Sequence, residues 1–179
     1  MKRRCSWCNL SNPLYVHYHD HIWGVPVHDD RLLFEMLVLE GFQAGLSWET
    51  ILNRKQAFEQ AFDGFEIETV AGYDIDKVNL LVKDASIIRN RRKIEAAVHN
   101  ARIILQIQKD HGSFDGWLWS FTGGKTMRDC NPIRSPLSDE ISKQMKRMGM
   151  QYTGTVIIQS FLMAVGVING HEQQCDWRE

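Results

Sequence analysis

Cysteine and histidine occur as two pairs near opposite ends of the 179-residue chain. Cys5 and His19 lie near the beginning, and His171 and Cys175 lie four residues apart near the end. On a helix or a tight turn, that spacing puts both side chains on one side. Two thiolates and two imidazoles suit a closed, tetrahedral zinc site with a structural role. A histidine taken alone is more often a surface or core residue, and rival ligands lie nearby. These rivals are Cys8, His17 and His21.

A glutamate in an apolar stretch is the second feature that could do chemistry. Glu40 follows three apolar residues and precedes Gly41 and Phe42, where a carboxyl group is costly unless it has a partner. Flat aromatic rings can stack on a nucleobase, and a buried carboxylate can favour a cationic ring. The alternative is that the rings are core residues and that Glu40 lies on a helix surface. The aromatic residues concerned are Trp7, Tyr15, Tyr18, Trp23 and Trp48.

A basic turn between two helical patterns could hold a phosphate. Backbone N–H groups at a helix start, with basic side chains beside them, suit the DNA backbone. Helix-hairpin-helix turns usually contain glycine, whereas this turn, residues 86–92, begins with Ser86 and has no glycine nearby. An ordinary corner between two helices with exposed arginines is therefore the alternative. The basic residues in and beside the turn are Arg89, Arg91, Arg92 and Lys93.

Other lysines raise two less favoured interpretations. Lys93 could form a Schiff base with a sugar, as a lyase does. The helical pattern instead directs Lys93 along the hairpin helix and away from the pocket. A second basic cluster is interpreted as the solvated face of a helix. Its members are Lys143, Lys146 and Arg147.

Composition limits the class of protein. A net charge of −1 argues against coating of nucleic acid through bulk charge but permits a local basic surface. No apolar run approaches the roughly 20 residues of a membrane helix, and no apolar stretch follows the basic N-terminus as in a signal peptide. We therefore expect a cytoplasmic protein without membrane association. Its four cysteines should bind metal or remain free thiols, with Cys130 free in a loop.

Helical periodicity dominates the chain. Gly41 and Gly45 are expected to end the first long helix. The segment 155–165 is apolar around most of its circumference and should form a buried central helix. Because no alternating strand pattern or repeat is present, the sequence predicts an all-α fold. The other helical patterns cover residues 29–40, 47–62, 74–82, 94–105, 117–121 and 135–149, with N-caps expected at Asp29 or Asp30, Ser47, Asp74 and Ser135.

Several blocks of sequence resemble the 3-methyladenine DNA glycosylase I family of the helix-hairpin-helix glycosylase superfamily. The resemblance covers nearly the whole chain, and the block at 40–48 is long and unusual in composition. The blocks are R-C-S-W at 4–7, P-L-Y-V-H-Y-H-D at 13–20, W-G-V-P at 23–26, L-F-E-M-L at 33–37, E-G-F-Q-A-G-L-S-W at 40–48 and V-I-N-G-H at 167–171.

The resemblance implies a role for each part of a base-binding site. Glu40 would recognise an extruded base, with Tyr18 and Trp48 as its close partners in catalysis. The turn at Gly45 and Leu46 would probe the duplex where the base has left. Further residues would line the pocket or contact phosphates. These are Trp7, Tyr15 and Trp23 for the pocket, and Ser86, Arg89, Arg91 and Lys93 for the phosphates.

The resemblance also implies one structural Zn²⁺ that joins the terminal segments, about 1–28 and 154–179, within a single unit covering 1–179. The helical hairpin would lie at about 74–110. The chain departs from the family at Ser86, where glycine is common, and at Gly170, where the family often has Asn-Asp-His and this chain has Asn-Gly-His. The implied zinc ligands are Cys5, His19, His171 and Cys175.

The function implied by the resemblance is monofunctional hydrolysis of the N-glycosidic bond of 3-methyladenine. The substrate would be double-stranded DNA containing alkylated adenine, and the protein would act as a monomer with no obligate protein partner. Alkylation at N3 gives adenine a positive charge and makes it a good leaving group. The superfamily's usual catalytic aspartate is not evident, so we expect modest chemical assistance, with water completing the reaction. The alternative is a non-catalytic, zinc-stapled, all-α DNA-binding module in which Glu40 belongs to the core.

Overall fold

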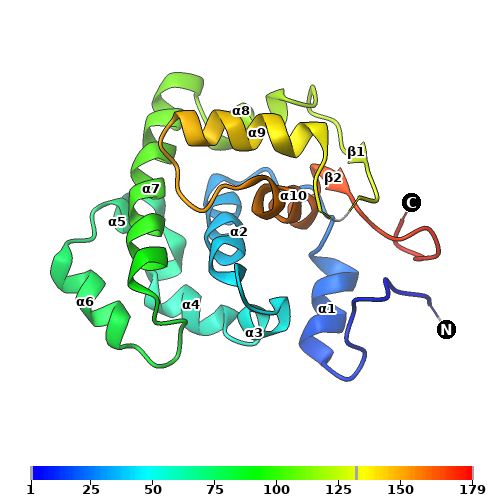
Figure 1. Ribbon diagram of the computed structural model, residues 1–179, viewed down its shortest axis with the longest axis horizontal. Coiled ribbons are helices and arrows are strands. Elements are labelled where there is room, and N and C mark those ends of the chain that lie inside the picture. Colours follow the sequence, from blue (N-terminus) through cyan, green and yellow to red (C-terminus); the bar gives the residue numbers. More distant parts are fainter. Residues whose placement is uncertain (1, 132, 179) are drawn as a thin grey trace.

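The computed structural model describes residues 2–131 and 133–178 and is mostly helical (Figure 1). The elements, in chain order, are α1 (Pro13–His21), α2 (Asp30–Gln43), α3 (Trp48–Leu52), α4 (Lys55–Ala61), the 3₁₀ turn η1 (Asp63–Phe65), α5 (Ile67–Ala71), α6 (Ile75–Lys83), α7 (Arg91–His111), α8 (Phe114–Ser120), β1 (Met127–Arg128), α9 (Pro136–Arg147), α10 (Thr155–Ala164) and β2 (Ile168–Asn169).

Short polar side chains begin several helices where the sequence predicts them. The side chain of Asp29 accepts a hydrogen bond from the first turn of α2, and Ser47, Asp74 and Ser135 do the same for α3, α6 and α9. Each satisfies an N–H group that has no partner within the helix. The predicted starts of these helices are confirmed.

Two predicted helix boundaries were wrong. Gly41 does not end α2, which continues to Gln43. A single glycine costs a helix only about 1 kcal/mol, and Gly41 is buried close to Tyr152. The pattern over 47–62 is not one helix, because the chain turns at residues 53–54 and divides it into α3 and α4.

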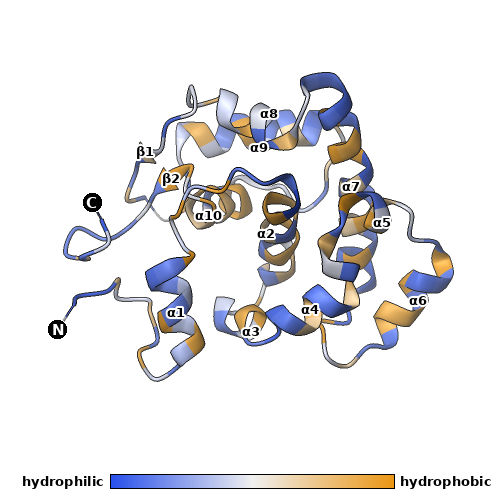
Figure 2. Ribbon diagram, turned by 180° about the vertical axis from the view of Figure 1, so that it is seen from behind, coloured by the Kyte–Doolittle hydropathy of each residue, from blue (hydrophilic) through white to orange (hydrophobic). Residues whose placement is uncertain are grey.

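The core is built around α2 and α10, which pack against each other. In α2, every residue from Leu33 to Phe42 is buried. In α10, the apolar side chains occupy nearly the whole circumference, as the sequence predicts for a central helix. Figure 2 shows apolar colour along both helices, whereas the longer α7 alternates between polar and apolar turns. The helices around α2 and α10 therefore hide these two from water and hold their ends in place.

A small parallel sheet modifies the all-α prediction. Strands β1 and β2 pair with Met127 opposite Ile168 and Arg128 opposite Asn169. Each strand has only two residues, which is too short for the alternating pattern that predicts strands in a sequence. The sheet holds the loop after α8 beside the segment that leads to the C-terminus.

The two terminal segments lie side by side (Figure 1). The backbones of Arg3 and Asp176 are joined by an N–H to carbonyl bond of 2.9 Å, and Trp177 donates its indole N–H to the Asp20 carbonyl at 3.0 Å. Glu172 accepts hydrogen bonds from the Ser6 backbone N–H at 2.7 Å and from the Ser6 hydroxyl at 2.6 Å. None of the helices in the described residues is long and apolar enough to cross a membrane.

Candidate base pocket and metal centre

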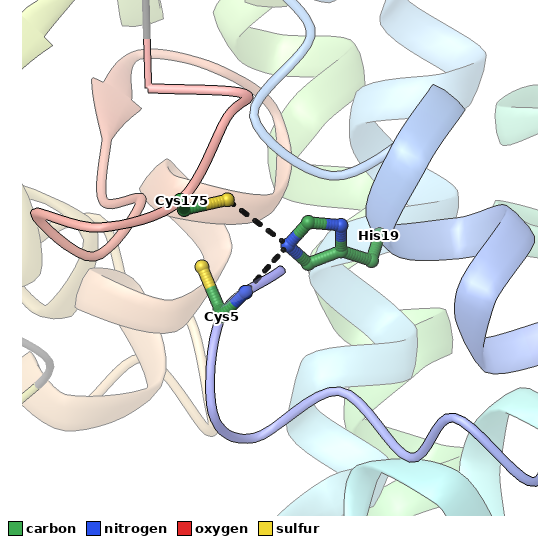
Figure 3. Close-up of side chains that lie close together, drawn as sticks. All are labelled: Cys5, His19 and Cys175. Carbon is green, nitrogen blue, oxygen red and sulfur yellow. Dashed lines mark hydrogen bonds between the residues drawn. The ribbon is translucent and has the colours of Figure 1, made fainter. Parts of the chain in front are cut away.

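Cys5, His19 and Cys175 meet where the terminal segments join (Figure 3). All three side chains are buried, and their potential ligand atoms lie within 4.8 Å of one another. The His19 Nε2 and Cys175 Sγ atoms are 3.5 Å apart. Zinc bond lengths and a tetrahedral angle give an N-to-S separation of about 3.5 Å. The spacing and chemistry of these three groups therefore fit a zinc ion.

The orientation of His19 is set by its neighbours. Asp20 Oδ1 lies 2.9 Å from His19 Nδ1, which leaves Nε2 facing the two cysteines. The Arg4 guanidinium donates to both Asp20 oxygens, at 2.7 and 2.6 Å. Hydrogen bonds from Arg4 and His19 lower the pKa of Asp20 to about 2, despite partial burial. A carboxylate behind a metal-binding imidazole is a common supporting arrangement because it holds the ring in one tautomer.

His171 lies beside the three-residue group and not within it. Its ring centroid is 5.3 Å from that of His19, and its Nδ1 atom is 3.0 Å from Asn169 Oδ1. The Nε2 atom is buried and has no hydrogen-bond partner. A buried imidazole nitrogen without a partner is costly, and a bound ion would satisfy it. The structure thus brings together three of the four predicted ligands and places the fourth next to them.

The rival ligands lie outside this group. The Cys8 thiol is buried and points toward the Tyr15 carbonyl at 3.8 Å. His17 and His21 lie on an exposed face of α1, with ring centroids 4.9 Å apart. In the part of the chain that the structure describes, the only such cluster of three potential ligands is Cys5, His19 and Cys175.

A cleft of about 250 Å³ lies next to this centre and gathers the predicted base-site residues. Glu40 enters from α2, Tyr18 from α1 and Trp48 from the start of α3, with the Tyr18 and Trp48 ring centroids 5.2 Å apart. Trp7 meets Trp23 edge to face at 4.8 Å. The lining residues are Trp7, Tyr15, Tyr18, Trp23, Glu40, Gln43, Trp48, Cys130, Ser160, Met163, Gly170 and Glu172.

Glu40 is the buried carboxyl group of this cleft. Its exposed fraction is 4%, and burial raises its pKa from 4.5 to about 8. Burial also raises the pKa of neighbouring Tyr18 well above its usual value, so Tyr18 remains a neutral phenol. Glu40 is accordingly protonated in the free protein at neutral pH. A cationic ring in the cleft would favour its ionised form.

The raised pKa of Glu40 predicts how stability depends on pH. The folded protein holds this proton more tightly than the unfolded chain, so ionisation destabilises the fold as pH rises from about 4.5 to about 8. Replacement of Glu40 by Gln should raise the free energy of unfolding by less than about 1 kcal/mol at pH 5 and by roughly 4–5 kcal/mol at pH 8.5. Urea unfolding of both proteins at the two pH values measures this difference. An equal difference at both pH values would contradict the burial of an ionisable Glu40.

Six lining residues were not predicted from the sequence. Gln43 could have been predicted, because it belongs to the E-G-F-Q-A-G-L-S-W block that also contains Glu40 and Trp48. For Gly170, the sequence indicates only a departure from the family. Ser160 and Met163 were hidden in the apolar pattern of α10. Cys130 is exposed and free, as predicted for a loop thiol, but its place in the cleft was not predicted. The sixth is Glu172.

Gly170 and Met163 form one wall of the cleft together. A Cβ atom on Gly170 would clash with Met163 Cε and would lie 3.0 Å from Met163 Cγ. We expect Gly170→Ala to lower the free energy of unfolding by about 1–3 kcal/mol because Met163 must move from a packed site. Shortening Met163 to Ala in the same chain should make the added methyl group nearly neutral. A thermodynamic cycle of the two substitutions tests this, and strictly additive effects would contradict it.

The residues predicted to meet DNA lie at two places. Leu46 is exposed in the turn after α2, where Gly45 adopts a φ of +83° that favours glycine. In the hairpin between α6 and α7, Arg89 is exposed, and Arg91 donates to Asn79 at 2.6 Å. Ser86 is exposed and donates its backbone N–H and its hydroxyl to Asp84, at 2.9 and 2.6 Å.

Lys93 differs from the expectation of a phosphate contact. Its side chain is buried, and its ammonium donates to the Phe42 carbonyl at 2.8 Å and the Ala44 carbonyl at 2.6 Å. The reason is the local geometry, because the third residue of α7 faces the end of α2 and not solvent. Within the fold, Lys93 therefore binds protein carbonyls.

The cleft holds the buried carboxyl group of Glu40 among aromatic rings, which is a suitable environment for a flat, electron-poor ring. The methyladenine glycosylase family model matches residues 7–179, and the chain belongs to this family.

Two relatives of known name match this chain over nearly their full lengths. DNA-3-methyladenine glycosylase 1 of Escherichia coli strain K12 is 41% identical over 179 residues, covering 96% of this chain and 95% of its own. DNA-3-methyladenine glycosylase of Haemophilus influenzae is 32% identical, with 98% and 97% covered.

Solved structures are similarly close. A crystal structure of 3-methyladenine DNA glycosylase I superimposes with a TM-score of 0.93 at 38% identity, covering 98% of this chain and 99% of the other. The Staphylococcus aureus enzyme, solved to explain its recognition of 3-methyladenine, gives a TM-score of 0.90 at 35% identity, with 98% and 96% covered.

Proposed function

We propose that this protein is a DNA-3-methyladenine glycosylase of the helix-hairpin-helix superfamily. It hydrolyses the N-glycosidic bond of 3-methyladenine in alkylated double-stranded DNA. The observation that carries the proposal is the buried Glu40 carboxyl group in an aromatic cleft next to Tyr18 and Trp48. Relatives with the same fold are named for this activity, and a variant of one was solved with 3-methyladenine bound. The protein acts as a monomer in the cytoplasm.

Recognition of the base follows from the contents of the cleft. An alkylated base flipped out of the duplex stacks against aromatic faces, and Glu40 accepts a hydrogen bond from its exocyclic amine. The positive charge that N3 alkylation gives the ring lowers the pKa of Glu40, so Glu40 loses its proton when the base binds. An uncharged adenine has no such effect and leaves Glu40 neutral. The cleft therefore selects for charge as well as shape.

Bond cleavage needs little help from the protein. The cationic ring leaves with the electron pair of the glycosidic bond, and water adds its oxygen to C1′ of the sugar and loses a proton. The other carboxylate of the cleft, Glu172, is hydrogen-bonded to Ser6. No aspartate lines the cleft in the described residues, which fits modest chemical assistance. The ring becomes neutral as the bond breaks and the positive charge passes to the sugar, so ionised Glu40 acts by holding the cationic base in the cleft before cleavage.

Two surfaces engage the duplex in this proposal. The exposed Leu46 enters the stack where the base has left. The hairpin between α6 and α7 meets the phosphates through the backbone at its turn and through Arg89 and Arg91. Ser86 helps to form this turn, because its backbone N–H and its hydroxyl both donate to Asp84. Lys93 has no phosphate contact here, because its ammonium is bound to Phe42 and Ala44.

We also propose one structural Zn²⁺ ion, held by Cys5, His19 and Cys175 with His171 as the fourth ligand. The fit rests on the clustered donor atoms and on the buried His171 Nε2 without a partner. When bound, the ion supplies no reaction chemistry and constrains the two terminal segments. Arg4 and Asp20 hold His19 in the tautomer that the site needs.

Release of free base from methylated duplex DNA tests the proposed activity. The wild-type protein should release 3-methyladenine, detected by chromatography, and leave the strand intact until alkali is added. The alternative, a DNA-binding module without catalysis, predicts binding of the duplex and no released base. A covalent adduct with abasic DNA after borohydride treatment would show lyase chemistry and contradict the monofunctional proposal.

A further inference from the structure

Lys93 links two parts of the molecule that the proposed function assigns to DNA. It lies in the first turn of α7, directly after the hairpin, and only 8% of it is exposed. The Asn90 side chain, which caps α7, accepts the Lys93 backbone N–H at 3.2 Å. The Lys93 side chain reaches the opposite way, to the end of α2, which lies beside α7 (Figure 1). One residue thus joins the hairpin to the end of the helix that carries Glu40.

The end of α2 needs such a partner. The last carbonyls of a helix have no N–H donor within the helix and carry its negative partial charge, so a cation there is favourable. The Lys93 ammonium satisfies Phe42 and Ala44 together, at 2.8 and 2.6 Å. Its third neighbour is the ring of Tyr152, with Nζ 5.9 Å from the centroid. Burial of this cation lowers the pKa of Lys93, and its partners are carbonyls and a ring.

The bonded carbonyls lie at the base of the Leu46 turn. Leu46 donates its N–H to the Gln43 carbonyl at 2.7 Å, and the Gln43 side chain donates back to the Leu46 carbonyl at 3.0 Å. These two bonds close the turn, but they do not fix its direction relative to the hairpin. The Lys93 ammonium fixes the turn relative to the hairpin, because it holds the carbonyl of Ala44, the residue immediately before Gly45 changes the chain direction.

We propose that Lys93 is a positioning residue, which sets the Leu46 turn at the correct distance from the phosphate-binding hairpin. The inference rests on the proposed glycosylase function. It predicts a step-specific effect. Loss of the anchor should impair extrusion of a base from a paired duplex, while the finished pocket around Glu40 keeps its affinity for a free base. A lysine with a purely structural role would affect all substrates alike.

The test compares Lys93→Met with the wild type on three ligands: a methylated duplex, the same methylated strand without its complement, and free 3-methyladenine. We expect single-turnover release from the duplex to fall about 100-fold, since small displacements of positioning groups cost this much. Release from the single strand and affinity for the free base should change less than about threefold. Lys109→Met, on the exposed last turn of α7, is the matched control and should match the wild type.

Two outcomes overturn the proposal. One is duplex activity of Lys93→Met within threefold of the wild type, and the other is an equal loss on all three ligands. If Lys93→Met does not fold, the same ratios are measured on Lys93→Arg, which keeps the charge with a bulkier head group. A duplex-selective loss of about tenfold is expected for it. Failure of the proposed function itself is distinct, because the wild type would then release no base.

Discussion

Replacement of Glu40 by Gln is expected to reduce kcat/KM for release of 3-methyladenine from duplex DNA at least about 100-fold, which is about 2.7 kcal/mol of transition-state stabilisation. The amide keeps the shape of the side chain and removes the negative charge that holds the cationic, flipped-out base in the cleft. The variant should fold normally, because the buried carboxyl is protonated at neutral pH and the amide resembles it. Single-turnover kinetics on a methylated duplex measure the loss.

A second buried glutamate on the same helix provides the control. Glu35 is 3% exposed and pairs with Lys55 and Arg31, and it is not among the residues that line the cleft. We expect Glu35→Gln to lower the free energy of unfolding because it breaks a buried ion pair, and to leave base release within a few-fold of wild type. Equal kinetic losses for the two variants would contradict the specific role of Glu40.

Removal of the proposed zinc should produce the largest loss of stability. Substituting His19 with Ala, or chelating the ion, leaves the two buried thiols without a bound metal and frees the terminal segments. We expect the free energy of unfolding to fall by about 4 kcal/mol or more. Denaturant unfolding combined with elemental analysis measures both effects, and purified wild-type protein should contain one zinc per chain.

Two other cysteines separate this effect from a general sensitivity to cysteine loss. Cys8→Ser removes a buried thiol outside the three-residue group and should retain zinc, with a stability cost typical of a core substitution. Cys130→Ser removes an exposed thiol and should change stability little. Zinc well below one per chain in unchelated wild type, or loss of zinc from Cys8→Ser alone, would contradict the proposed ligand set.

Local signals in the sequence predicted the elements that begin at a cap. Asp29, Ser47, Asp74 and Ser135 each precede an apolar helical pattern, and each caps the helix in the structure. The buried nature of α10 also followed from its composition. Glu40 is predictable as a site residue because a carboxyl group among apolar neighbours is costly without a partner, and in the structure it is buried and lines the cleft.

Features that depend on distant contacts could not be predicted in this way. The pairing of β1 with β2 involves two residues from each strand, and a pattern that short carries no periodicity. The fit of Met163 over Gly170 depends on how α10 meets the C-terminal segment. A buried lysine such as Lys93 looks in the sequence like a surface phosphate contact, because only the folded chain brings the carbonyls of Phe42 and Ala44 to it.

The central claim is that the cleft around Glu40 holds 3-methyladenine, and titration with the free base tests it most directly. Trp7, Trp23 and Trp48 line the cleft, so binding should change the tryptophan fluorescence. We predict a saturable response at one base per chain for 3-methyladenine, with weaker binding of adenine and with the preference reduced in Glu40→Gln. Absence of saturation with 3-methyladenine, or equal affinity for adenine in the wild type, would contradict the account.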